Sequence, residues 1–303
     1  MRFVVFVVEI FFEMKSVFEF WETNLIYEVV AGSQAYGLAR EGSDVDIRGV
    51  CIPPKPYLLG LSEFEQFENP THDVVIFALK KFIRLALGCN PNIIEILYVE
   101  PQHILFINSA GERLRAAGEI FLTRRAAETF GSYAVAQLRK LERHHRWIVA
   151  PPEKSPTPEE FGGRPHRGRF KFPDSDAERA YRAAQRHWDN YQKWRRERNP
   201  SRAELEAKFG YDTKHAMHLL RLLRMGREIL AAGKVLVLRP DAEWLRAVRD
   251  GLLRYEELLE LAQQGEAELN EVIKTSPLPA TPDFAAAENL VIELHEKYLR
   301  ETA

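Results

Sequence analysis

Two aspartates two residues apart, Asp44 and Asp46, are the first residues here whose types and spacing predict chemistry. A strand is predicted over residues 45–52, and side chains two apart at a strand lie on the same face of its sheet. Two carboxylates on one face repel each other unless a cation lies between them, and Mg²⁺ prefers such oxygen ligands. The pair therefore predicts a magnesium site that keeps room for water and substrate phosphates.

Gly32 and Ser33 stand upstream of the aspartates, where a predicted strand over 26–31 ends and a short helix over 33–39 begins. Glycine lets a phosphate come close to the backbone, and the free N–H groups of a first helical turn attract anions. A phosphate site is thus predicted beside the metal site. Either motif alone is common, but their combination in GSQAYGLAREGSDVDIRGV is far more specific.

This string, from Gly32 to Val50, resembles the motif of the DNA polymerase β-like nucleotidyltransferases, and in its full form their RlaP-type branch, which is associated with RNA ligases. The resemblance continues in NPNIIEILYV (90–99) and YDTKHAMHLLRLLRMGREIL (211–230), and so spans most of residues 26–240. It implies an enzyme that moves a nucleoside monophosphate from an NTP to a hydroxyl, with Mg²⁺ or Mn²⁺, and releases pyrophosphate.

The resemblance also implies roles for single residues. Gly32 and Ser33 would hold the triphosphate, and Asp44 and Asp46 would bind the metal. Such enzymes usually add a third carboxylate from a later strand, as base and metal ligand for the attacking hydroxyl. Three residues are candidates for it: Asp73, which opens a predicted strand over 73–77, with Glu68 and Glu95 as alternatives. An aspartate at a strand start is also a common turn residue, so that interpretation stays open.

A predicted helix over 213–232 carries His215 and His218 three residues apart, with several cations, Arg224 among them, on overlapping faces. As a metal pair the two histidines lack a third ligand. The helix is either a solvated basic face or a surface that contacts triphosphate or RNA backbone. The resemblance favours the second interpretation for three residues in particular: Lys214, His218 and Arg221. Asp212, just before the helix, is predicted to be its N-cap.

Three further basic stretches could contact RNA. One predicted helix mixes rings with cations: Trp188, Tyr191 and Trp194 with Arg186, Lys193, Arg195, Arg196 and Arg198. Such rings stack on single-stranded bases, or they pack in a core while the arginines reach solvent. The basic end of the helix over 124–146 carries His144 and His145. A Pro- and Gly-rich segment at 151–175 is predicted to be a long surface loop or a partly disordered arm, with cations that could close over a polyanion: Arg164, Arg167, Arg169 and Lys171.

Predicted strands and helices alternate along the first part of the chain and position these residues. The rest of the chain is predicted to be almost wholly helical. Beyond the strands named above, Asn90 and Pro91 are predicted to cap a helix over 93–98, and a late strand is predicted over 234–239. The pattern predicts an α+β fold, with a small mixed-sheet nucleotidyltransferase domain over residues 1–110 followed by a mainly helical domain over 111–303.

Composition excludes several classes of protein. The 303 residues are 46% hydrophobic and 28% charged, which argues against disorder and collagen-like repeats. Two cysteines, Cys51 and Cys89, with no CxxC or Cys/His cluster, indicate a reducing compartment and no structural zinc site, and we expect a cytoplasmic protein. The apolar run over 3–12 is too short to span a membrane and is not typical of a signal peptide. Whether Met14 is the natural start or the run adds a strand stays open.

Charge is distributed unevenly along the chain. The net charge of −2 combines −7 over residues 1–112, +11 over 113–230 and −6 over 231–303. An acidic first part could hold cations and a basic middle part a polyanion. With the resemblance, this predicts an NTP and an RNA 3′ end, of a tRNA or another RNA, as substrates. Two alternatives remain: transfer to a protein hydroxyl, as in antitoxin-type enzymes, and a noncatalytic module that binds nucleotide or RNA.

Overall fold

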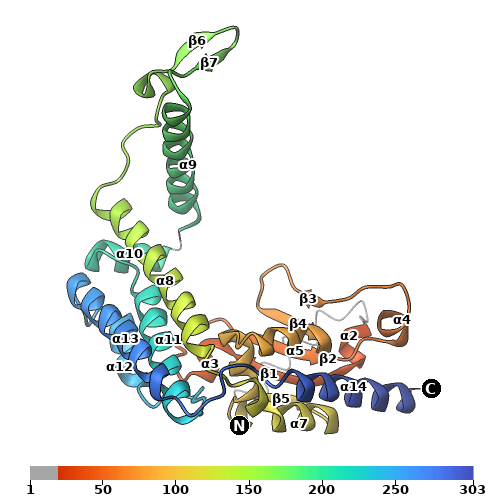
Figure 1. The fold of residues 1–303 in the computed structure, drawn as a ribbon. Helices are drawn as coiled ribbons and strands as arrows, with labels where there is room; N and C mark the ends of the chain where they lie inside the picture. Colours follow the sequence, from red (N-terminus) through yellow and green to blue (C-terminus); the bar gives the residue numbers. More distant parts are fainter. Residues whose placement is uncertain (1–19, 199, 303) are drawn as a thin grey trace. The chain divides into compact units, whose positions relative to one another are not determined.

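The computed structural model describes residues 20–198 and 200–302, which form two compact units (Figure 1). Unit 1 contains the described residues up to 132 together with residues 222–244 and those from 265 onward. Unit 2 contains residues 133–221 and 245–264. The open question of the first 13 residues falls outside the described residues.

Unit 1 is built on a five-stranded mixed sheet with the order β3-β4-β2-β1-β5. Its strands are β1 (Leu25–Ala31), β2 (Asp46–Cys51), β3 (Gln66–Glu68), β4 (Val74–Ala78) and β5 (Ile104–Ile107). β1 runs antiparallel to β2 and β5, β3 runs antiparallel to β4, and β2 and β4 are parallel. The predicted α+β fold is confirmed. The sheet also contains the short strands β3 and β5, which were not predicted.

Helices cover this sheet because their apolar residues recur at helical spacing. α5 (Leu79–Leu87) buries Leu79, Phe82 and Ile83. α6 (Pro91–Leu97) begins two residues before the predicted helix but has the predicted N-cap, since the Asn92 N–H donates to the Asn90 side chain at 3.0 Å. The other helices wholly within unit 1 are α2 (Phe20–Thr23), α3 (Gly32–Ala35), α4 (Lys55–Leu58), α7 (Ser109–Ala116) and α14 (Phe284–Glu301), with 3₁₀ turns at Pro101–His103 and Gly118–Phe121. α14 packs against α5.

Four helices run from one unit into the other: α8 (Ala126–Val149), α11 (Thr213–Ala232), α12 (Ala242–Arg249) and α13 (Tyr255–Thr275). The bounds of α11 are those predicted. The strand predicted over 234–239 is wrong. Val235 and Val237 are buried while Leu236 and Leu238 are each 43% exposed, so the alternation is real. None of the described strands pairs with this segment, which instead bonds to the turn after β1 through the Arg239 N–H and the Tyr36 carbonyl at 3.2 Å.

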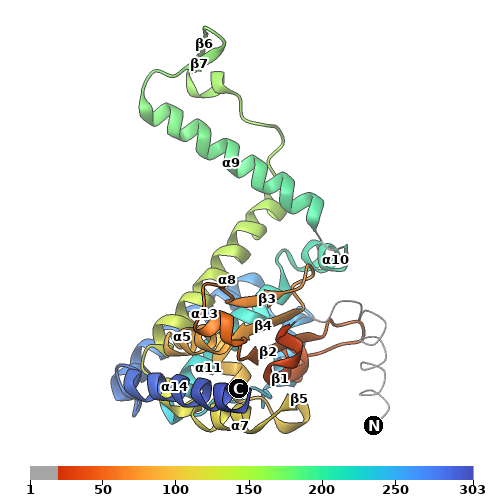
Figure 2. The same cartoon turned by 90° about the vertical axis from the view of Figure 1, so that its right-hand side faces the viewer.

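Unit 2 contains α9 (Ser175–Glu197), α10 (Pro200–Phe209), a 3₁₀ turn at Pro158–Phe161 and a small hairpin of β6 (Arg164–His166) and β7 (Arg169–Lys171). The hairpin lies at the N-terminal end of α9 (Figure 2). The segment predicted to be a long surface loop or a partly disordered arm thus contains a pair of short strands, and these strands are exposed. Arg167 and Gly168 have φ of 47° and 77° and join strands that pair directly, as in a two-residue type I′ turn.

Both cysteines are free and buried, and burial raises the pKa of Cys51 to about 12. Within the described chain, none of the helices combines the length and the apolar character that a membrane span needs.

Candidate active site

Asp46 opens β2 directly opposite Ala31, the last residue of β1. It therefore lies beside Gly32, the first residue of α3. Gly32 has a φ of 63°, and a Cβ on it would come within 2.1 Å of Asp46 Oδ2. Only glycine allows the backbone to approach the carboxylate this closely. The two residues that the sequence motif pairs are thus in direct contact.

Asp73 lies at the same level as Asp46, one residue before the neighbouring strand β4. β2 and β4 are parallel with Ile47 opposite Val74, and the Ile47 N–H donates to the Asp73 carbonyl at 2.7 Å. Asp46 and Asp73 each stand one residue before this pair, so they occupy matching positions on strands about 4.8 Å apart. Arg48 bonds to both residues, from Nη2 to Asp46 Oδ1 at 3.2 Å and from Nη1 to the Asp73 carbonyl at 2.8 Å. Its guanidinium offsets the carboxylate charge of Asp46.

Asp44 and Ser33 lie in the connections next to these strands. Asp44 is exposed and precedes β2, which begins at Asp46, so strand alternation does not fix the direction of the Asp44 side chain. Ser33 is half-buried in α3, and its carbonyl accepts from the Leu38 N–H at 2.8 Å. The predicted helix over 33–39 is shorter than expected because the backbone turns left-handed at Gly37, where φ is 70°.

The two alternative carboxylates have other surroundings. Glu95 is 5% exposed in α6 and accepts a hydrogen bond from the Tyr36 hydroxyl. Glu68 is exposed on β3, one strand further from β2 than β4 is, and lies 2.7 Å from His72 Nδ1. The strand register therefore favours Asp73 as the neighbour of Asp46.

The predicted cations of α11 are divided between the units. Three lie in unit 2: Lys214, His218 and Arg221. Arg224 lies in unit 1, where it donates to Asp241 Oδ2 at 2.7 Å and its guanidinium stands 3.7 Å from the centre of the Trp244 ring. Burial lowers the pKa of His218 well below its usual range, and the nearby charge of Arg221 lowers it further. Arg224 therefore has packing partners of its own, which the sequence did not indicate.

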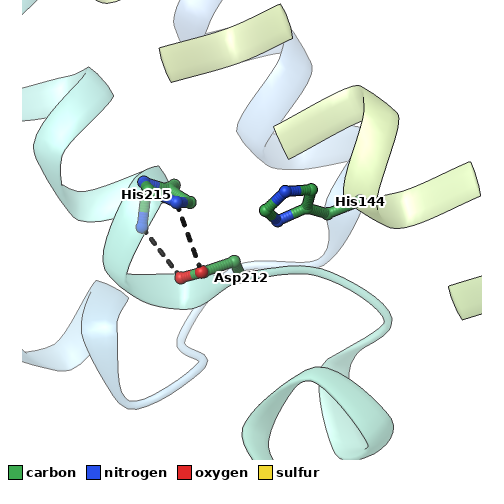
Figure 3. Close-up of side chains that lie close together, drawn as sticks. All are labelled: His144, Asp212 and His215. Atoms are coloured by element: carbon green, nitrogen blue, oxygen red, sulfur yellow. Dashed lines mark hydrogen bonds and ion pairs between the residues drawn. The ribbon is translucent and has the colours of Figure 1, made fainter. Parts of the chain in front are cut away.

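Three side chains that the sequence did not bring together meet in unit 2 (Figure 3): His144 from α8, and Asp212 and His215 at the start of α11. One ligand atom of each lies within 4.8 Å of the other two. The prediction that Asp212 is the N-cap of α11 is confirmed, because its Oδ1 accepts from the N–H groups of Lys214 and His215 at 2.9 and 3.0 Å. Asp212 and His215 are three residues apart and can be recognised as a pair in the sequence, but no sequence pattern connects them with His144.

The aromatic rings of the basic helix pack within unit 2. Trp147 of α8 lies 5.9 Å from Tyr191 and 5.3 Å from Trp194 between ring centres. The Trp147 indole N–H donates to His187 Nε2 at 2.9 Å, and the Arg198 guanidinium stands 4.6 Å from the Trp194 ring. These contacts favour core packing over base stacking for this part of α9.

A mixed sheet with carboxylates at the ends of adjacent strands, beside a glycine-serine turn, is the arrangement expected for the polymerase β-like class of nucleotidyltransferases. Comparison with known families agrees with that class. The RNA repair pathway DNA polymerase beta family, RlaP, matches residues 9–292, and the chain belongs to this family. The resemblance in the sequence is thereby confirmed. The family implies a polymerase β-like nucleotidyltransferase role in RNA repair.

Among curated proteins, the chain is similar to the Uncharacterized protein YcgL of Bacillus subtilis (strain 168), with 30% identity over 89 residues. The match covers 28% of this chain and 34% of that protein, so the chain spans about a third of its relative's length. No solved structure matches the chain.

Proposed function

We propose that this protein transfers a nucleoside monophosphate from an NTP to the 3′ hydroxyl of an RNA and releases pyrophosphate. The observation that carries the proposal is the contact of Gly32 with the carboxylate of Asp46, with Asp73 in register with Asp46 directly before the adjacent strand. Membership of the RNA repair family supports the same chemistry.

The donor set at this edge of the sheet is of the chemical type that a divalent metal takes, although its three carboxylates do not converge within 4.8 Å of one another in the structure. Asp44, Asp46 and Asp73 offer carboxylate oxygens alone, which suits Mg²⁺ or Mn²⁺. These three residues would hold the metal. When bound, such a metal neutralises phosphate charge and activates a hydroxyl as the nucleophile.

The residues of the chain supply position and charge. Gly32, which has no side chain, leaves room for a phosphate against the backbone beside Asp46, and Ser33 follows it in the same turn. Asp73 accepts the proton of the attacking hydroxyl, and Arg48 holds the Asp46 carboxylate in its orientation. In-line attack depends mainly on such positioning and on charge neutralisation. Lys214, His218 and Arg221 remain the predicted residues for the triphosphate or the RNA backbone.

RNA is the proposed acceptor because of the basic middle part of the chain. The hairpin of β6 and β7 is exposed throughout, and its cations stand beside Phe170, which is itself 43% exposed. A hollow next to the hairpin is lined by His166, Arg169 and Lys171, together with residues of the first turn of α9. Cations beside an exposed ring are typical of surfaces that bind single strands, where phosphates meet the charges and bases stack.

The direct test is to supply each α-labelled NTP with Mg²⁺, an RNA ending in a 3′ hydroxyl, and cell protein. We expect label in the RNA, and none when the same RNA ends in a 3′ phosphate. Label in protein would instead favour the protein-hydroxyl alternative, and no label with any NTP would favour the noncatalytic binding module.

Carboxylate variants test the site itself. Asp46→Asn and Asp73→Asn keep the side-chain volume and remove the charge, so we expect each to lower turnover by about 10²–10³-fold without loss of folding. Glu68→Gln is the matched control one strand away and should keep turnover near that of the unaltered protein. If Glu68→Gln abolishes transfer while Asp73→Asn does not, the assignment of Asp73 is wrong.

A further inference from the structure

The side chains of His144, Asp212 and His215 form a group of ligand type inside unit 2 (Figure 3). As whole residues, His144, Asp212 and His215 are 6%, 3% and 8% exposed, respectively. Nδ1 of His144 has no hydrogen-bond partner among the described residues. A buried polar atom without a partner is unusual in a folded protein, and an ion or water that is not drawn is a common explanation.

The spacing of the ligand atoms suits a metal better than a direct hydrogen bond. Asp212 Oδ2 lies 3.5 Å from His215 Nε2, which is long for a hydrogen bond. Two ligands that are each about 2.0–2.1 Å from a tetrahedral zinc ion lie about 3.3 Å apart. All three ligand atoms lie within 4.8 Å of one another, so modest side-chain movement would bring them onto one ion.

The surroundings hold these ligands in place. Oδ1 of Asp212 is engaged by the Lys214 and His215 N–H groups, which orients the carboxylate and leaves Oδ2 on the side of the histidines. The His144 ring stacks on Trp147, with 5.5 Å between ring centres, and lies 5.5 Å from the Trp194 ring. Hydrogen bonds to a ligand and an apolar shell around it are the features that strengthen metal sites in proteins.

We propose that His144, Asp212 and His215 bind one zinc ion, which fastens α8 to the start of α11 within unit 2. Two imidazoles and one carboxylate are a common zinc ligand set, whereas Mg²⁺ and Ca²⁺ prefer oxygen ligands alone. The sequence predicts no structural zinc site because its cysteines form no cluster, and this site uses no cysteine. It shares no residue with the carboxylates of the sheet, and its three protein ligands leave a fourth position on the ion for water.

The full-length protein tests the proposal directly. After purification and exhaustive dialysis against metal-free buffer, we expect about one zinc per chain by elemental analysis. Removal of zinc with a chelator should lower the melting temperature, and added zinc should restore it, because an ion that binds only the folded state stabilises that state. Cobalt in place of zinc should give the visible absorption of a tetrahedral site.

Variants distinguish this site from adventitious metal. Asp212→Asn keeps an N-cap oxygen for α11 but removes the ligand charge, and His144→Gln removes one imidazole. We expect each to weaken zinc binding at least tenfold. His145→Gln is the matched control, because His145 stacks on Tyr255 and bonds to the Gly210 carbonyl outside the group. Absence of bound zinc in the unaltered protein, with no shift in melting temperature on zinc addition, would overturn the proposal, as would variants that bind zinc like the parent.

Discussion

At the scale of single residues, the contact between Gly32 and Asp46 is the tightest constraint on the proposed site. Gly32 combines a left-handed backbone with a carboxylate oxygen where its Cβ would be. Gly42 has a similar φ of 74°, yet nothing lies within 4 Å of the position of its Cβ. Alanine substitutions at the two glycines therefore distinguish two effects: the strain of a left-handed backbone, which both share, and the clash with the Asp46 carboxylate, which only Gly32 has.

We expect Gly32→Ala to abolish nucleotidyl transfer, because the new methyl group displaces the Asp46 carboxylate. Gly42→Ala should cost about 1–2 kcal/mol of stability through its left-handed backbone and leave transfer intact. Turnover and melting temperature of both variants, measured side by side, check this. Equal loss of transfer in both would show that backbone strain, and not the contact with Asp46, limits the reaction.

At the scale of elements, a charged network holds the segment between α11 and α12. The side chain of Arg239 is fully buried and donates to Glu228 of α11 at 2.6 and 2.8 Å and to Asp241 at 2.9 Å. Asp241 also accepts from Arg224. Burial alone would raise the pKa of Asp241, but the hydrogen bonds from Arg239 and Arg224 outweigh it and lower that pKa.

This network predicts acid sensitivity of unit 1. Above about pH 4, where an unfolded aspartate is ionised, the lowered pKa of Asp241 contributes its full stability. As the pH falls further, the unfolded chain takes up the proton first and that stability is lost. Asp241→Asn should therefore lower the melting temperature at pH 7, and its difference from the parent should shrink toward pH 3. Scanning calorimetry at several pH values measures this difference.

The control for acid sensitivity is Glu293→Gln. Glu293 pairs with Arg113 at 3.0 Å on the surface, where an ion pair contributes little because solvent screens it. Its effect on melting temperature should be small at every pH. A difference for Asp241→Asn that does not change with pH would contradict the assigned role of its carboxylate.

Sequence reasoning works where one local pattern determines an element. The apolar spacing and N-cap of α11 give its bounds, and the glycine-serine turn with the downstream aspartates locates the edge of the sheet. Buried and exposed residues alternate over 234–239 as they do in a strand. Such alternation shows which side chains are buried, but it does not show that the segment hydrogen-bonds to another strand. The group around His144 could not be predicted because its members come from distant parts of the chain, and only packing of α8 on α11 brings them together.

At the scale of the whole molecule, charge is distributed unevenly along the chain. The basic hairpin of β6 and β7 allows a test of whether the basic middle part binds RNA. Arg167 and Arg169 can be replaced together by Gln. If each contacts one phosphate of single-stranded RNA, the negative slope of log K against log salt should become less steep by about 1.4. The matched pair Lys297 and Arg300 on α14, replaced in the same way, should leave the slope unchanged. Binding titrations at several salt concentrations decide this, and equal slopes for all three proteins would remove the hairpin from the RNA surface.

The order in which the segments of unit 1 occur also matters during synthesis. The Tyr298 hydroxyl of α14 donates to the Asn24 side chain next to β1 at 2.8 Å, so the last helix closes on the first strand. Unit 2 is complete at residue 264, before α14 has been made. During synthesis, unit 2 can therefore fold before β1 gains its contact with α14. The helix that closes on β1 is thus added after all of unit 2 has been made.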